Sequence, residues 1–185
     1  MTDQKVETVR AKWPLDYAAK IAEELKTMLE PTCERIQIAG SIRRKKPFVG
    51  DIELLCIPKV DAFGSAHLID CSLAELCAQD VLALRLNKRG QHTYGPKNKL
   101  LVHPASGINV DLFTADAQNW GMALMVRTGP KEFNIMMMTR FRSLGMQGHA
   151  YGGVTDAQGR EIDCPNEETV YWLLGWGWVP PEERR

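Results

Sequence analysis

GSIRRKKPFVGDIEL (residues 40–54) carries a glycine–serine pair and, ten residues after the serine, the first of two acids. Apolar and polar residues alternate over Arg35–Ala39, which predicts a strand that runs directly into the glycine turn. A second strand is predicted over Asp51–Pro58. Because side chains alternate between the two faces of a strand, Asp51 and Glu53 should share one face, opposite the apolar residues.

A third acid is predicted on a separate strand downstream. The segment NVDLF (Asn109–Phe113) alternates in the same way and places Asp111 on one face. Hard cations such as Mg²⁺ prefer oxygen ligands and leave coordination positions for water and phosphate. Asp51, Glu53 and Asp111 are therefore the candidate ligands of two divalent ions that would clamp an attacking hydroxyl and a leaving pyrophosphate.

The glycine turn adds a candidate phosphate site. Gly40 lets the backbone approach a triphosphate, and free N–H groups with the Ser41 hydroxyl can cradle it. Arg43 or Arg44 could neutralise the charge that develops on the β- and γ-phosphates. A D-x-E pair or a glycine–serine pair alone is weak; their ordered combination with Asp111 is far more specific and points to a metal-dependent nucleotidyltransferase.

The rest of the chain predicts an α+β protein. A domain with a mixed β-sheet and helices is expected over residues 1–115, followed by a small α+β lobe over 116–185. Helices are predicted at residues 14–30, 73–80, 119–126 and 131–144, and at a last short segment capped by Asn166. Further strands are predicted at 82–86 and 100–103, and a hairpin joins 151–154 to 160–163.

Composition narrows the class of protein. The chain of 185 residues is 44% hydrophobic and 25% charged, as in globular domains, and it has no apolar run long enough to span a membrane. No secretory signal is visible, and the five cysteines are odd in number without a C-x-x-C pair, so an intracellular, cytoplasmic protein is expected. The net charge of zero argues against bulk coating of nucleic acid. Basic residues instead gather locally, notably over Arg85–Lys99.

These motifs resemble the polymerase beta-like nucleotidyltransferase superfamily. GSIRRKKPFVGDIEL resembles its G-S…G-D-x-[DE] signature, and the G-S-x-R-R element is similar to that of family-X DNA polymerases. VDLF (Val110–Phe113) resembles the strand of the third acid, and RTGPKEFN (Arg127–Asn134) resembles the segment joining palm and thumb. GWGWVPPEERR at the carboxy terminus is similar to the end of the family's thumb. The resemblance covers most of the chain.

The resemblance implies a nucleotidyltransferase palm in residues 1–115 and a thumb in 116–185. It implies that Asp51, Glu53 and Asp111 bind two Mg²⁺ ions, with Mn²⁺ as an alternative. The implied nucleotide contacts are Gly40, Ser41, Arg44, Gly50, Gly129 and Asn134. The basic strip supplies the candidate DNA contacts, which are Lys88, Arg89, Lys97 and Lys99.

Five positions depart from the family pattern. The second acid is usually aspartate, whereas this chain has Glu53. Val126 and Arg127 replace an aromatic pair that helps to exclude ribonucleotides. Asn109 and Met138 stand where arginines are frequent. The lobes that grip duplex DNA and remove a 5′-sugar phosphate are not expected, which leaves a palm-plus-thumb layout known among minimal viral members and suggests a phage or viral origin.

The function expected from these observations is template-directed DNA polymerisation. Deoxynucleotides from deoxynucleoside triphosphates would be added to a primer 3′-hydroxyl on primer–template or gapped DNA by two-metal phosphoryl transfer, in short-patch repair or gap filling. A monomer without membrane association is expected. Two alternatives stay open: a nucleotidyltransferase that extends nucleic-acid ends or another acceptor without a template, and a nucleic-acid-binding accessory with a degenerate site. The missing DNA-gripping lobes favour the first alternative, and the three retained carboxylates speak against the second.

Overall fold

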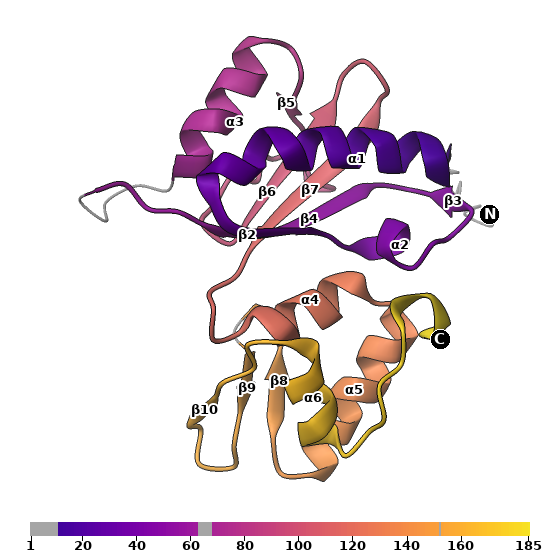
Figure 1. Ribbon diagram of the computed structural model, residues 1–185, viewed down its shortest axis with the longest axis vertical. Helices are drawn as coiled ribbons and strands as arrows, with labels where there is room; N and C mark the ends of the chain where they lie inside the picture. The colour runs from indigo at the N-terminus through magenta and orange to yellow at the C-terminus, as the bar shows by residue number, and fades with distance from the viewer. Residues whose placement is uncertain (1–10, 63–67, 152) are drawn as a thin grey trace, which may run out of the picture.

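The computed structural model describes residues 11–62, 68–151 and 153–185. The chain forms an α+β protein of two stacked lobes (Figure 1). The first, called the sheet lobe, extends to the end of strand β7 at Thr114; the second, called the carboxy-terminal lobe, begins with helix α4. None of the described helices combines the length and apolar character needed to cross a membrane. The expectation that there is no signal sequence rests on the first 13 residues, of which residues 1–10 lie outside the described part.

A mixed five-stranded sheet forms the centre of the sheet lobe. Its strand order is β2-β4-β7-β6-β5, and β4 and β7 are parallel whereas the other neighbours are antiparallel. This confirms the predicted mixed sheet. The strands are β2 (Cys33–Ile38), β4 (Ile52–Pro58), β5 (Ala83–Leu84), β6 (Asn98–His103) and β7 (Ile108–Thr114). A small ribbon pairs β1 (Trp13–Pro14) with β3 (Phe48–Val49).

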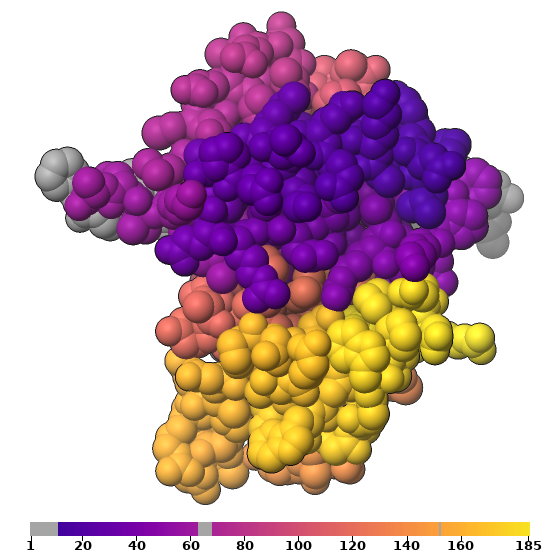
Figure 2. Space-filling view, viewed as in Figure 1, coloured from indigo at the N-terminus to yellow at the C-terminus, as the bar shows by residue number. Residues whose placement is uncertain are grey.

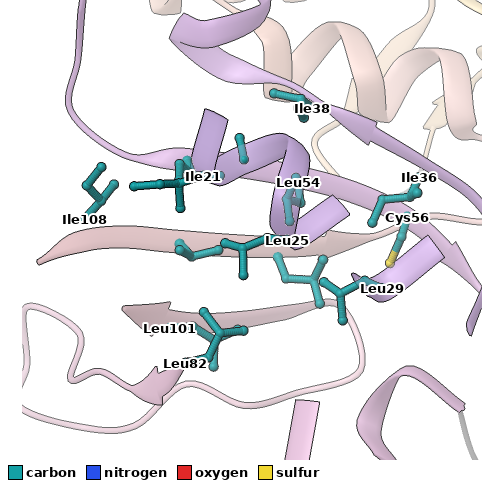
Figure 3. Packing of buried hydrophobic residues seen from close by; sticks show 14 of the residues in the cluster. Ile21, Leu25, Leu29, Ile36, Ile38, Leu54, Cys56, Leu82, Leu101 and Ile108 are labelled. Atoms are coloured by element: carbon teal, nitrogen blue, oxygen red, sulfur yellow. The ribbon is translucent and has the colours of Figure 1, made fainter. Parts of the chain in front are cut away.

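Helix α1 (Leu15–Leu29) covers one face of this sheet (Figure 1). It begins after Pro14, whose fixed φ suits a helix start, and one stripe of its surface is apolar. Ile21, Leu25 and Leu29 from that stripe pack among the apolar side chains of the strands (Figure 3). A short 3-10 turn, Glu30–Thr32, then leads into β2. The predicted helix at 14–30 is confirmed.

Helix α3 (Leu68–Ala78) is longer at its start than the predicted segment 73–80. The sequence pattern S-L-A-E suggested that Ser72 caps the helix. In the structure Ser72 lies inside the helix, because Ile69 and Leu73 are both fully buried against the core and the helix continues through them. Burial of an apolar face outweighs a local capping preference here.

The carboxy-terminal lobe contains three helices and a small antiparallel sheet among its described residues. Asn166 caps its last helix, because its side chain accepts a hydrogen bond from the Thr169 N–H at 2.8 Å. The three-stranded sheet has the order β10-β9-β8. Strand β8, which comes first along the chain, was not predicted. The elements are α4 (Trp120–Thr128), α5 (Lys131–Ser143), β8 (Gln147–His149), β9 (Gly153–Thr155), β10 (Glu161–Ile162), α6 (Glu167–Leu174) and a 3-10 turn, Pro181–Glu183.

An apolar cluster joins the two lobes. Trp120 and Leu124 of α4 pack with Leu55 of β4 and Phe113 of β7. Trp120 is fully buried in this cluster. Because α4 packs directly on the sheet face opposite α1, the carboxy-terminal lobe is seated beside the strands that carry the predicted acids (Figure 1).

Candidate active site

Two of the predicted acids lie side by side on neighbouring strands. In the parallel pair β4–β7, Glu53 is the register partner of Asp111, so both side chains leave the same face of the sheet. Asp51 directly precedes β4, and its charge acts on Glu53. Ile52 and Leu54 alternate with these acids and are fully buried in the core. The alternation that forms the core therefore also gathers the three carboxylates.

The carboxyl group of Glu53 is poorly solvated. Burial first, and then the charges of Asp51 and Asp111, raise the pKa of Glu53 from its ordinary 4.5 to about 8. The guanidinium groups of Arg127 and Arg44 act in the opposite direction. Burial and like charges both disfavour the ionised carboxyl, whereas a bound cation would favour it. The acids thus form an electrostatically coupled group suited to a cation.

We expect the stability of the metal-free protein to fall with rising pH because of Glu53. Its folded-state pKa of about 8 lies above the ordinary 4.5. Between these values the folded state binds more protons than the unfolded state, so the free energy of unfolding decreases as pH rises through this window. Glu53→Gln removes the effect. Thermal unfolding should show that the melting temperature of the variant, relative to that of the wild type, is higher at about pH 8.5 than at about pH 5.

Glu75 provides the matched control for this experiment. It is an exposed glutamate on α3, remote in sequence from the acids, and Glu75→Gln should leave the pH dependence of unfolding as it is in the wild type. If Glu53→Gln changed stability by the same amount at both pH values, the raised pKa of Glu53 would be refuted.

Gly40 begins the short helix α2 (Gly40–Arg43) against Glu53. Its φ of +61° lies in the left-handed region that favours glycine. A Cβ at this position would lie 3.0 Å from Cδ of Glu53, so glycine also leaves room for the longer acid. The neighbouring Ser41 Oγ is buried and lacks a hydrogen-bond partner among the described residues. An orphaned hydroxyl can donate to a phosphate oxygen.

A cavity of about 500 Å³ opens between Glu53 and the carboxy-terminal lobe. Three of the predicted nucleotide contacts, Arg44, Gly129 and Asn134, line it together with Glu53. Asn134 Oδ1 is buried and has no hydrogen-bond partner in the described part of the chain. We call this space the nucleotide cavity. The predicted contacts outside its lining are Gly40, Ser41 and Gly50.

A second cavity, of about 430 Å³, has Asp51 and Asp111 in its wall, and Gly50 lies here. We call it the acceptor cavity. Arg85 also lines it and forms an ion pair with Asp111. Arg85 begins the basic strip noted in the sequence but was not among the predicted site residues; its sequence signal is a basic residue between two leucines on the predicted strand 82–86. The acids therefore lie between two cavities, since Glu53 lines the other one.

The donor chemistry of this face fits a hard cation, because three carboxylates supply oxygen ligands. In residues 11–62, 68–151 and 153–185, no three acid, histidine or cysteine side chains are already grouped as metal ligands. Two contacts account for this. Asp111 is engaged by Arg85, and the Glu53 carboxyl lies against Gly40. The acids fit the ion by charge and ligand type.

The predicted DNA contacts differ in exposure. Lys88, Arg89 and Lys97 are exposed around the connection between β5 and β6. Lys99 is 1% exposed, and its Nζ lies 3.2 Å from Oδ1 of Asp70. A buried, paired ammonium cannot contact DNA without breaking that pair, so the expectation for Lys99 is withdrawn. The pattern of basic residues could not distinguish Lys99 from its neighbours.

The chain is similar to known proteins in part of its sequence and in its fold. Residues 123–185, about a third of the chain, match the family described as DNA polymerase beta thumb. The crystal structure of Leishmania infantum polymerase beta in a ternary P/T complex is similar to the chain, with a TM-score of 0.75 and 19% identity over 96% of this chain and 78% of that one. The two proteins share a fold. The comparison with curated proteins gave no match.

One departure from the family-X pattern has a visible structural role. The guanidinium of Arg127 lies 3.7 Å from the ring centre of Phe113 and 4.4 Å from that of Tyr151. It therefore packs between β7 and the segment before β9, as a cation can on aromatic faces. Val126 and Met138 line the nucleotide cavity. In place of the aromatic pair, Val126 therefore gives the cavity an aliphatic wall, and Arg127 lies between two aromatic rings.

A buried ion network joins the two lobes. Arg43 Nη2 lies 2.6 Å from Glu167 Oε2, and Arg184 Nη1 donates to Glu167 Oε1 at 2.9 Å. Glu167 is 4% exposed and Arg184 1% exposed. Figure 2 shows the yellow carboxy-terminal residues against the purple surface around α2. Arg43 was a candidate for the triphosphate, but the structure gives it this role and leaves Arg44 in the nucleotide cavity.

Proposed function

We propose that the protein is a template-directed DNA polymerase that adds deoxynucleotides to a primer 3′-hydroxyl by two-metal phosphoryl transfer in gap-filling repair. One observation carries the proposal: Glu53 and Asp111, in register on parallel strands, lie between a cavity with Arg44, Gly129 and Asn134 and a second cavity on the other side. The family-X fold and the matching thumb support a nucleotidyltransferase of the polymerase type.

The proposed metal ligands are Asp51, Glu53 and Asp111. Two Mg²⁺ or Mn²⁺ ions, when bound, would stabilise the charge on the attacking and leaving oxygens. The acceptor 3′-oxygen forms a bond to the α-phosphorus and the bond from that phosphorus to the pyrophosphate oxygen breaks. The hydroxyl proton passes to solvent water, and pyrophosphate leaves. Asp111, which lies in the wall of the acceptor cavity, would orient the attacking hydroxyl.

The remaining residues of the site would bind and orient the nucleoside triphosphate. Arg44 and the orphaned Ser41 hydroxyl are donors for the phosphates. Gly129 lies in the cavity wall without a side chain and permits close approach of the sugar. Asn134, with a buried unpaired Oδ1, supplies an amide that can hydrogen-bond to the base.

The proposed partners are deoxynucleoside triphosphates and primer–template or gapped DNA, bound by a monomer. The exposed cations Lys88, Arg89 and Lys97 provide a phosphate-binding surface on a chain of zero net charge. The similar Leishmania protein was solved in a ternary P/T complex. Binding that depends on few phosphate contacts should weaken with salt, because each contact releases condensed counterions.

The proposal is tested by primer extension on gapped DNA with Mg²⁺ or Mn²⁺. We expect incorporation of the nucleotide complementary to the template base, and little extension of a single strand. Equal extension of single strands, without dependence on the template base, would instead establish the template-independent alternative. Failure to incorporate any nucleotide, with metal-dependent binding of a nucleoside triphosphate in calorimetry, would leave a binding protein with a degenerate site.

A further inference from the structure

Arg85 is held on the same face of the sheet as the acids. Its backbone N–H donates to the Leu100 carbonyl at 3.1 Å, which continues the β5–β6 pairing by one residue. Leu100 is in turn the register partner of Asp111 on β7. Neighbouring strands lie about 4.8 Å apart, so Arg85 is about 10 Å from Asp111 across the sheet. The long arginine side chain spans Leu100 and pairs with the Asp111 carboxylate.

The ion pair leaves part of the Arg85 guanidinium unused. Its Nη2 donates to Asp111 Oδ1, whereas its Nε is buried and has no hydrogen-bond partner among the described residues. A buried donor without an acceptor is unfavourable, and a guanidinium fork suits a phosphate particularly well. Lys88 lines the same cavity and adds a second positive charge. An anionic ligand would satisfy both groups.

We infer that Arg85 binds the phosphodiester that precedes the reacting 3′-hydroxyl of the acceptor strand, while the same guanidinium orients Asp111. This inference rests on the proposed function and adds a positioning residue to it. Arg85 would therefore do two things for the acceptor strand. It would fix the position of the strand by binding its last phosphodiester, and it would hold the Asp111 carboxylate next to the 3′ end of that strand.

The arrangement favours the acceptor strand over the triphosphate as the source of this phosphate. The nucleotide cavity has its own cations, including Arg44, Lys131 and Arg142, and Glu53 faces it. Arg85 lies in the other cavity with Asp51 and Asp111. Asn109 of that cavity is neutral, whereas Arg85 forms an ion pair with Asp111 there.

The test is a double-mutant cycle between Arg85 and one linkage of the DNA. Gapped DNA is prepared with a dideoxy-terminated primer, so that no reaction occurs, and with either a normal or a neutral methylphosphonate last linkage. Binding to wild type, Arg85→Met and Arg85→Lys is followed by fluorescence anisotropy. Arg160→Met, at an exposed arginine in the β9–β10 turn, is the matched control. Thermal unfolding establishes that each variant is folded.

We expect the neutral linkage to weaken wild-type binding roughly tenfold or more, as for a hydrogen bond to a charged group. Arg85→Met should bind both DNAs with the same low affinity, and Arg85→Lys should recover part of the preference. The Michaelis constant for the nucleotide should be unchanged. Arg160→Met should behave as wild type does.

Two results would overturn the inference. One is an equal preference for the charged linkage in wild type and Arg85→Met. The other is a raised nucleotide Michaelis constant with unchanged DNA affinity, which would assign the phosphate to the triphosphate. Because the binding cycle needs no catalysis, a wild-type protein that fails to extend primers would refute the proposed function without deciding the role of Arg85.

Discussion

Asp111→Asn should lower the rate of nucleotide incorporation by about a thousandfold or more. The amide has nearly the shape of the carboxylate but lacks the charge that a divalent ion requires, and stabilisation by such ions is worth several kcal/mol in a transition state. The asparagine oxygen can still accept a hydrogen bond from Arg85, so the variant should fold. Single-turnover incorporation on gapped primer–template with saturating nucleotide measures the effect.

Asp163→Asn is the matched control for this variant. Asp163 is an exposed aspartate after β10, far in sequence from the three acids, and its replacement should leave incorporation unchanged. A folded Asp111→Asn variant whose rate stays within about tenfold of the wild type would remove Asp111 from the metal site. Thermal unfolding of each variant separates loss of chemistry from loss of structure.

Glu167→Gln should reduce the free energy of unfolding by about 3–5 kcal/mol. Glu167 is buried between Arg43 and Arg184, whose side chains are 17% and 0% exposed. Removing the shared carboxylate leaves two poorly solvated guanidinium groups without their counter-charge. For a protein of this size, the loss corresponds to a melting temperature lower by roughly 10 °C. Chemical denaturation at neutral pH gives the free energy directly.

Glu168→Gln, on the next residue of α6, is the control, because an exposed glutamate contributes within about 0.5 kcal/mol. Acid offers a second readout. Burial opposes ionisation of Glu167, but hydrogen bonds from Arg43 and Arg184 hold its pKa below the ordinary 4.5. Its contribution is therefore present above about pH 4.5 and lost as pH falls further. A loss below about 1 kcal/mol for Glu167→Gln would contradict the network's role.

The strands and the main helices could be predicted because their patterns are local. Period-two alternation located β4 and β7, and the apolar stripe located α1. Strand β8 was missed because its three residues include a glycine and show no such alternation. The predicted start of α3 was wrong, because a local capping pattern does not show which residues the core buries.

In the candidate site, too, local patterns predicted some residues, and contacts between distant elements decided the others. The motif identified Asp51 and Glu53, because their spacing on one strand gives them a common face. It identified Asp111 as an acid on a separate strand. Arg85 was missed as a site residue, and Lys99 was misjudged. Both depend on partners from other elements, Asp111 and Asp70 respectively. A basic residue in a strip has no sequence feature that reveals whether an acid lies within reach in the folded chain.

The parallel register that pairs Glu53 with Asp111 constrains how this sequence can change in evolution. A single residue inserted or deleted within β7 would reverse the facing of every later side chain in that strand. Val110 and Leu112 would then leave the core face in the same event that turned Asp111 into the core. A length change in the strand interior thus cannot damage the chemistry while sparing the fold. Tolerated insertions are expected instead in the connection between β5 and β6, which carries the exposed Lys88, Arg89 and Lys97. The length of this connection can vary without changing the register of β7.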